Sequence, residues 1–213
     1  MRIDLNNCFM IKLSHVIYKA DNLYKSVEDF KKKGFTVEFG SRVNPHNALI
    51  YFSEGPYIEI IQKAPISTFL KFILKLIGKQ SLAKRFERWD KAKKGFFEIC
   101  FENYNKDFDQ EIKILKKYNQ KYFITKSERT DPKNRTLKWN LLFPRDYRLP
   151  FFMTYFNIDP KPRNFIHPNG IKKIHKVKYG NEKRLLKIIN EMCNDETLNL
   201  QANLKEELII LEF

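Results

Sequence analysis

Two side chains that could carry out chemistry together are His15, in Leu13-Ser-His-Val-Ile-Tyr18, and Glu59, in Tyr57-Ile-Glu-Ile-Ile61. An imidazole and a carboxylate in contact can transfer protons, and the same pair can hold a polar ligand by hydrogen bonds. Both runs are rich in β-branched and aromatic residues, which predicts strands. Side chains alternate between the two faces of a strand, so both can point into one hollow. We therefore expect a catalytic or ligand-binding pair; a buried pair that stabilises the core is the alternative.

Other side chains could contact a ligand in the same hollow: Asn47, Tyr51, Tyr57, Arg129, Arg135, Trp139 and Tyr155. The asparagine offers both a donor and an acceptor, and the aromatic rings could stack on a ligand. The arginines flank a predicted turn and could each bind a carboxylate or phosphate with two N–H groups. At strand spacing the rings could equally belong to the core, and the arginines could be solvated.

Three further histidines, His46, His167 and His175, could complete a set of metal ligands. Histidine is the usual metal ligand, although a single histidine on a sheet or loop is more often only hydrogen-bonded. His167 and Asn169 lie in Pro160–Gly170, a loop by composition, and both are candidates for ligand binding. The cofactor prediction is therefore none certain, possibly a divalent metal.

The elements that would position these side chains follow the order β-α-β-β-β. Residues 11–19 form the first predicted strand, and Asp21 or Asn22 can cap the next helix. Its apolar face has helical spacing, and Gly34 ends it. Three more strands are expected over residues 35–39 and on either side of the turn at 53–56.

The same order of elements recurs later in the chain. The second copy consists of a strand at 95–101, a helix at 107–118 and strands at 122–128, 136–143 and 150–156. In this copy Phe97 is expected near the place of His15, and Met153 or Thr154 near that of Glu59. A repeated unit of this kind cannot cover its own sheet, so two copies are expected to pair.

The remaining segments are a connector, residues 63–94, and a C-terminal part, residues 165–213. The connector holds ten basic and two acidic side chains and predicts two helices, with Lys71, Lys75 and Lys79 on one face. A solvated face is the favoured interpretation; a cationic lid, or a surface for anionic membrane or nucleic acid, is the alternative. The C-terminal part reads as a shortened third unit, β-α-β-β. We expect one paired domain over 10–158 with this unit packed on it.

Composition limits the possible partners and location. The net charge of +15 favours anionic partners, and 43% hydrophobic content predicts a packed globule. Cys8, Cys100 and Cys193 have no zinc or disulfide spacing, so we expect reduced thiols in a cytoplasmic protein. The sequence begins without an apolar signal, and the stretch 69–77 is too short and too charged to span a bilayer.

The chain resembles the glyoxalase-like domain family of the vicinal oxygen chelate superfamily. The resemblance covers roughly residues 12–180 and rests on strings in matching order: His15-Val-Ile-Tyr, Gly34-Phe-Thr-Val, Asn47-Ala-Leu-Ile, Tyr57-Ile-Glu-Ile, Arg135-Thr-Leu-Lys-Trp139, Leu149-Pro-Phe-Phe152 and His167-Pro-Asn-Gly170. It implies an α+β fold in which paired βαβββ modules form a half-open barrel around a pocket. It also implies a metal held by a His and a Glu from each module, of which only His15 and Glu59 have counterparts here.

Three classes of function follow. The first is a protein that binds or sequesters a small anionic metabolite or nucleotide without turnover, as a monomer or homodimer. The second, implied by the resemblance, is a metal-dependent lyase, isomerase or dioxygenase that uses His15 and Glu59. The third is a nucleic-acid-binding protein that uses the basic segments 63–94 and 161–187; it lacks a known recognition signature. The sequence leaves open whether the protein is an enzyme.

Overall fold

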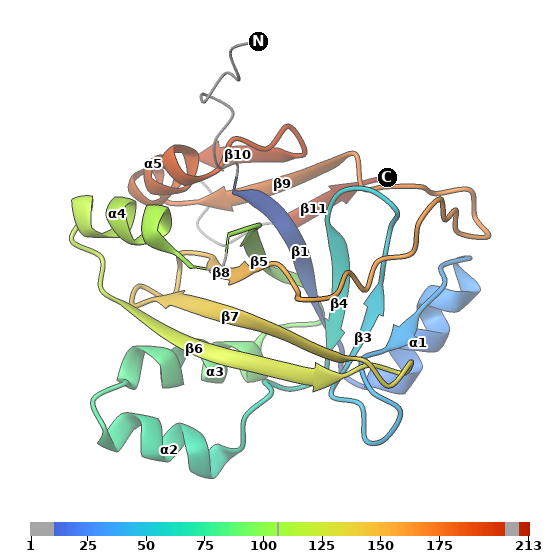
Figure 1. The fold of residues 1–213 in the computed structure, drawn as a ribbon, viewed down its shortest axis with the longest axis horizontal. Coiled ribbons are helices and arrows are strands. Elements are labelled where there is room, and N and C mark those ends of the chain that lie inside the picture. Colours follow the sequence, from blue (N-terminus) through green and yellow to red (C-terminus); the bar gives the residue numbers. More distant parts are fainter. Residues whose placement is uncertain (1–10, 106, 203–208) are drawn as a thin grey trace.

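The computed structural model describes residues 11–105, 107–202 and 209–213 of the chain (Figure 1). Its first module consists of β1 (Lys12–Lys19), α1 (Leu23–Lys32), β2 (Glu38–Phe39), β3 (Asn47–Ile50) and β4 (Tyr57–Ile61). Two connecting helices follow, α2 (Thr68–Leu76) and α3 (Gln80–Lys91). The second module consists of β5 (Gly95–Asn103), α4 (Asp109–Lys117), β6 (Tyr122–Thr130), β7 (Thr136–Pro144) and β8 (Phe151–Thr154). The C-terminal unit consists of β9 (Lys176–Asn181), α5 (Lys183–Met192), β10 (Leu198–Ala202) and β11 (Ile209–Glu212).

The two modules form one curled sheet with the strand order β2-β3-β4-β1-β5-β8-β7-β6. At its centre β1 and β5 run antiparallel, and each pairs on its outer side with the last strand of its own module, in parallel. The order therefore reads the same outward from the centre in both directions. This confirms the predicted α+β fold, in which paired βαβββ modules form a half-open barrel.

The strand register corrects one predicted equivalence. His15 pairs with Tyr57 in the first module, and Cys100 pairs with Phe151 in the second. His15 and Cys100 also lie opposite each other where β1 meets β5. The residue equivalent to His15 is therefore Cys100 and not Phe97, because an aromatic pair near the start of β5 is no guide to its register. Met153 does occupy the place equivalent to Glu59, two residues after Phe151 as Glu59 is after Tyr57.

Helix α1 forms as its sequence predicts. The side chain of Asn22, rather than that of Asp21, accepts a hydrogen bond from the Lys25 backbone N–H and caps the helix. Leu23, Val27 and Phe30 are buried against the sheet. The predicted strand at 35–39 is shorter, because only Glu38–Phe39 pairs with β3.

The C-terminal unit has the predicted order β-α-β-β, but its strands are arranged differently from those of a module. β9 lies between β10 and β11, parallel to the first and antiparallel to the second. In the two modules the first strand pairs in parallel with the last strand and does not pair with the strand that follows the helix, so this unit is not a shortened copy of them. The predicted break at Asn203 lies outside the described residues.

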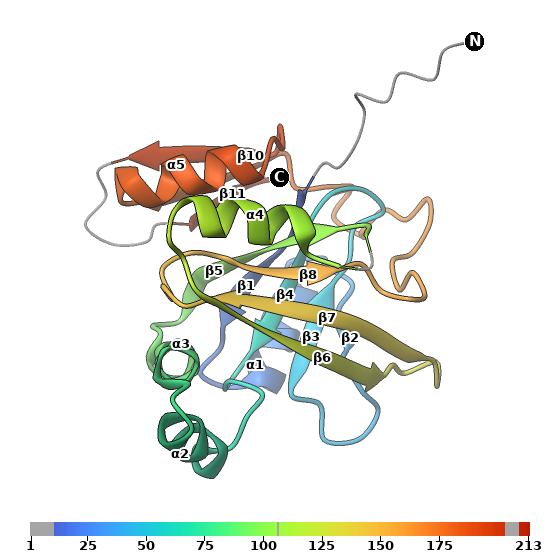
Figure 2. The same cartoon turned by 60° about the vertical axis from the view of Figure 1, so that its left-hand side comes forward.

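Figures 1 and 2 show this unit at one end of the molecule, over α4, and the connecting helices at the opposite end. Buried side chains of the C-terminal unit, among them Val177, Leu185 and Ile189, continue the hydrophobic core between α1 and the outer face of the sheet. The inner face of the sheet has a separate core to which α3 contributes Phe86 and Trp89. In the described part of the chain, no helix is long and apolar enough to cross a membrane. Cys100 and Cys193 are buried free thiols; Cys8 lies outside the described residues.

Candidate functional site

A cavity of about 470 Å³ lies on the inner face of the sheet. The first module contributes polar side chains to its wall, among them His15, Asn47 and Glu59, together with the ring of Tyr57. Apolar and aromatic side chains come from α3 and the second module: Phe86, Trp89, Trp139, Leu141, Phe143, Phe151, Met153 and Phe156. Strand β6 of the second module adds the polar residues 125–129. The hollow expected from the sequence is therefore present, and both modules contribute polar groups to its lining.

His15 and Glu59 meet at this cavity, with 3.3 Å between His15 Nε2 and Glu59 Oε2. The Asn47 side-chain amide donates a hydrogen bond of 2.6 Å to the other carboxylate oxygen. Burial alone would raise the pKa of Glu59, but its contacts with His15 and Asn47 outweigh burial and hold that pKa below its ordinary value. Glu59 therefore carries its negative charge inside the cavity at neutral pH.

The imidazole of His15 is held in place on several sides. It stacks on the Tyr57 ring, with 4.7 Å between ring centroids, and meets the edge of Phe151. Its Nδ1 lies 3.0 Å from the hydroxyl of Ser14, and that hydroxyl donates a 2.7 Å hydrogen bond to the buried carboxylate of Glu102. Since the hydroxyl hydrogen points to Glu102, Ser14 accepts from Nδ1–H. A chain of polar contacts therefore runs from Glu59 through His15 and Ser14 to the second module.

The other imidazole nitrogen of His15 lies against Glu59. His15 Nε2 is buried and has no partner of acceptable geometry among the described protein groups, although Glu59 lies at ion-pair distance. Buried polar atoms in native proteins are nearly always paired. Because both side chains line the cavity, the His15–Glu59 pair is the feature of this cavity most suited to contact a ligand.

The donor set at this place does not make up a metal site. A catalytic metal takes about three protein ligands, and the described residues contain no group of three His, Cys, Asp or Glu side chains placed to hold one. The second module offers Cys100 and Met153 at the equivalent positions. Burial raises the pKa of the Cys100 thiol well above its ordinary value, so the thiol stays protonated and is a poor ligand. No metal-dependent step is assigned to this cavity.

Helix α3 is attached to the second module by a buried ion pair and forms one wall of the cavity. Arg85 and Glu98 are almost completely buried, with 3.2 Å between Arg85 Nη1 and Glu98 Oε2. Trp89 Nε1 donates a hydrogen bond of 3.0 Å to the same oxygen, and Arg85 also donates to the Leu149 carbonyl. Arg88 completes the cluster through Glu98. These contacts fix the Trp89 ring where it lines the cavity.

Arg129 joins the two edges of the half-open barrel. From β6 it donates hydrogen bonds to the Gly40 carbonyl, at 2.5 Å, and to the Tyr51 hydroxyl, at 2.9 Å. Arg42 crosses in the opposite direction and donates to the Pro132 carbonyl. Arg129 also lines the cavity. Two of its N–H groups are therefore already bonded to protein. Arg129 lines the pocket, but it is not free to bind an anion with both of these groups.

Several predicted site residues do not line the cavity. Arg135 forms an ion pair with the buried Asp131 and stabilises the turn after β6. Tyr155 stacks on Tyr104 and donates to Asp159, beside a second, shallower hollow that shares Trp139 with the main cavity. His46 does line the cavity, whereas the exposed His175 lies on the C-terminal side of the molecule.

The loop with His167 and Asn169 supports the back of the first module. Asn169 donates to the Lys33 carbonyl from its side chain and to the Gly34 carbonyl from its backbone. Gly34 has φ of +80°, and a Cβ there would lie 2.7 Å from Asn169 Cβ, so this contact requires glycine. His167 Nδ1 accepts from the Thr36 backbone N–H, among the rings of Phe35, Phe52 and Phe165. Neither side chain lines the cavity.

Sequence reasoning missed Ser14, Glu102 and the part that α3 takes in the site. The contact of Ser14 with Glu102 depends on an irregularity in the pairing of β1 with β5 between Leu13 and His15, which no local pattern signals. The helical spacing of Phe86 and Trp89 was a usable signal for a buried face, but not for which face of the sheet it covers.

A half-open barrel of two βαβββ modules, with a histidine and a glutamate meeting inside it, defines a protein of the vicinal oxygen chelate superfamily. A profile of the glyoxalase-like domain family matches residues 13–186. The chain belongs to this family, as the sequence resemblance predicted.

Solved structures similar to this chain add information on the fold. A hypothetical protein from Staphylococcus aureus aligns with a TM-score of 0.63 and 18% identity, over 93% of this chain and 88% of that one. A hypothetical protein from Bacillus halodurans aligns with a TM-score of 0.38 and 13% identity, over 72% and 99%. A mutant of glyoxalase I from Zea mays aligns with a TM-score of 0.23 and 13% identity, over 68% of each chain. No curated protein matches the sequence.

Proposed function

We propose that this protein binds a small anionic metabolite or nucleotide in the cavity, without metal-dependent turnover. The observation that carries the proposal is the His15–Glu59 pair in the lining of a mostly apolar cavity of about 470 Å³. Cavities of this size are typical of small-molecule sites, where a few polar groups orient a ligand held by apolar contacts. The aromatic wall with Trp89 and Trp139 suits a flat group on the ligand.

The preference for an anion follows from charge. Basic side chains outnumber acidic ones around the cavity: Lys63, Lys126 and Arg129 against Glu59 and Glu128. The whole chain carries a net charge of +15, which raises the local concentration of anions near its surface. Glu59 repels a negative group placed beside it, so the anionic part of the ligand is expected next to Lys63 or Lys126. A hydroxyl or N–H of the ligand would then face Glu59.

The test is native mass spectrometry of the purified protein, followed by denaturation and identification of any released small molecule. We expect a stoichiometric ligand with negative charge. Replacement of His15 by Gln should weaken its retention about tenfold or more, because one buried hydrogen bond is lost. The matched control is His175→Gln, which changes an exposed histidine outside the cavity. Equal ligand retention in the two variants would contradict the proposal.

A cytoplasmic location is inferred on separate grounds. Cys100 and Cys193 are buried free thiols, and unpaired cysteines are the rule in reducing compartments. Measurement of the thiol state in cells, by alkylation before and after reduction, tests this inference.

A further inference from the structure

Helix α2 turns an apolar face toward solvent, whereas an amphipathic helix usually turns its apolar face toward the protein. Its lysines face the protein, where Lys71 is buried and pairs with Asp90, and Lys75 pairs with Glu87 at 2.5 Å. Asp90 also accepts a hydrogen bond from the Ala64 backbone N–H just before the helix. This corrects the expectation of a solvated lysine face for Lys71, whereas Lys75 is exposed as expected. The ion pairs to α3 therefore fix α2 so that its other face points outward.

The outward face of α2 is apolar. Phe69 is 72% exposed, Phe72 55% and Leu76 66%, and Leu70 and Ile77 are exposed beside them. Figures 1 and 2 show α2 as the outermost element at its end of the molecule, beyond α3. Exposed apolar patches that are contiguous and rimmed by polar residues mark interaction surfaces. The face of α2 meets this description over its full length.

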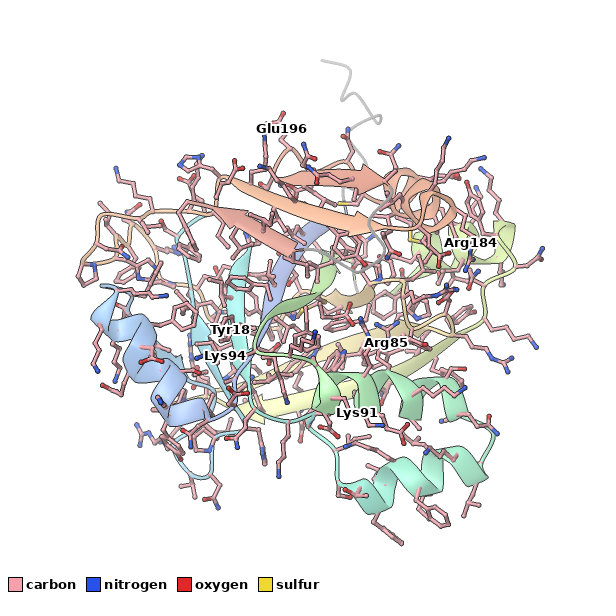
Figure 3. All side chains as sticks on the ribbon, turned by 180° about the vertical axis from the view of Figure 1, so that it is seen from behind. Tyr18, Arg85, Lys91, Lys94, Arg184 and Glu196 are labelled. Carbon is pink, nitrogen blue, oxygen red and sulfur yellow. The ribbon has the colours of Figure 1, made fainter. Side chains whose placement is uncertain are left out.

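Lysines without acidic partners surround the two helices. Both acidic residues of the connector are neutralised by Lys71 and Lys75, and its two arginines are paired with Glu98. The other lysines have no carboxylate within 4.0 Å among the described residues: Lys63, Lys79, Lys84, Lys91, Lys93 and Lys94. Figure 3 shows Lys91 at the end of α3 and Lys94 beyond it toward the sheet. The apolar face therefore lies in a region of uncompensated positive charge.

We propose that the outward face of α2, with the lysines of residues 63–94 around it, docks on the surface of an anionic lipid bilayer. Phenylalanine and leucine at the membrane interface, supported by lysine near anionic headgroups, are the composition of helices that lie in that interface. Each basic residue near such a surface adds attraction, and the effect weakens with salt. No residue of α2 lines the ligand cavity, although Lys63 before the helix does.

A second copy of the chain fits this face less well than a bilayer does. Symmetric pairing would bring two connectors of equal positive charge together, with no acidic surface to oppose them. A stable protein interface takes about 20–30 residues from each side, whereas α2 is a helix of nine residues. A nucleic acid would use the lysines but would leave the phenylalanines exposed.

The test is co-sedimentation of the full chain with vesicles of phosphatidylcholine alone or with about one-third phosphatidylserine. We expect binding only to the anionic vesicles, and weaker binding at high salt. Phe69→Gln with Phe72→Gln should weaken the partition into the vesicles about tenfold for each phenylalanine, because each substitution removes one aromatic ring that would be buried in the membrane interface. Both side chains are exposed, so their loss leaves the fold intact. The matched control is Tyr24→Gln, an exposed aromatic residue on α1.

A charge test separates insertion from simple adsorption. Lys84→Glu with Lys91→Glu should weaken binding, whereas Lys25→Glu with Lys32→Glu on α1 should change it much less. Binding that depends on the lysines but is unchanged in the phenylalanine variant would overturn the proposal in favour of a polyanion such as nucleic acid. No binding to anionic vesicles at low salt would also overturn it. A dimer in solution that the phenylalanine variant converts to a monomer would assign the face to a second copy.

Discussion

The two modules follow the same chain path but use their inner polar residues in different ways. In the first module, His15 and Glu59 line the cavity and lie at ion-pair distance from each other. In the second module, Cys100 and Met153 occupy the equivalent places, and the buried charge of Glu98 is neutralised by Arg85 from α3. The first module therefore supplies the chemistry of the site, while the second holds the helix that covers it. A repeated fold need not repeat its site.

The largest expected effect comes from breaking the support in the second module. Arg85→Met leaves Glu98 buried with fewer donors, so we expect the free energy of unfolding to fall by about 3 kcal/mol, measured by urea denaturation. Arg184→Met is the matched control, because Arg184 lies on the outside of α5 (Figure 3), where it pairs with the exposed Glu182 and with Asp146. Its effect should stay within about 0.5 kcal/mol. Equal effects in the two variants would show that α3 is not held by this ion pair.

An intermediate effect is expected from making the second module resemble the first. Met153 Sδ lies 3.4 Å from the Ser14 hydroxyl, beside the His15 imidazole. Met153→Glu would add a third ligand to His15 and Glu59, which is the number that a catalytic zinc site takes. We expect one bound Zn²⁺ per chain by elemental analysis, and stabilisation of about 2.7 kcal/mol at a hundredfold excess over Kd. Met153→Gln is the control; equal zinc content in both would contradict the assigned equivalence with Glu59.

The smallest expected effect is on the pH dependence of stability, and it follows from the difference between two buried histidines packed in or against the first module. His15 has a carboxylate neighbour, whereas burial among aromatic rings lowers the pKa of His167 below 6.5. Below pH 6.5 the unfolded chain therefore binds a proton at His167 more readily than the folded chain does. The free energy of unfolding falls as the pH falls below 6.5. We expect a loss of about 1 kcal/mol between pH 7 and pH 5.5 by urea denaturation. His167→Asn should reduce this slope and His46→Asn should retain it; equal slopes would make the prediction wrong.

Much of the fold could be predicted because its signals are local. The helical spacing of Leu23, Val27 and Phe30 was enough to predict α1, and a second set of alternating segments was enough to predict the second module. The pairing of two open sheets follows from the need to cover apolar faces. Register was not predictable in the same way: Phe97 looked equivalent to His15, and only the pairing of β1 with β5 identifies Cys100.

The site was predictable in part, for a related reason. His15, Glu59, Asn47 and Tyr57 come together because they lie on adjacent strands, where alternation fixes the face. Arg135 and Asn169 lie in turns whose contacts are set by the rest of the fold, and both bind backbone or nearby side chains instead. The orientation of α2 depends on Glu87 and Asp90, which are separated from its lysines by a turn. No periodicity within α2 alone contains that information.

The contacts of Arg129 and Arg42 between the edges of the sheet have a kinetic consequence. Since β2 and β6 are not paired with each other, the mouth of the barrel can widen without separating any two strands. Only side-chain hydrogen bonds, such as those to Gly40, Tyr51 and Pro132, have to open in the described part of the chain. A ligand of the cavity would thus enter and leave on the timescale of side-chain and loop motion, while the hydrophobic core stays packed.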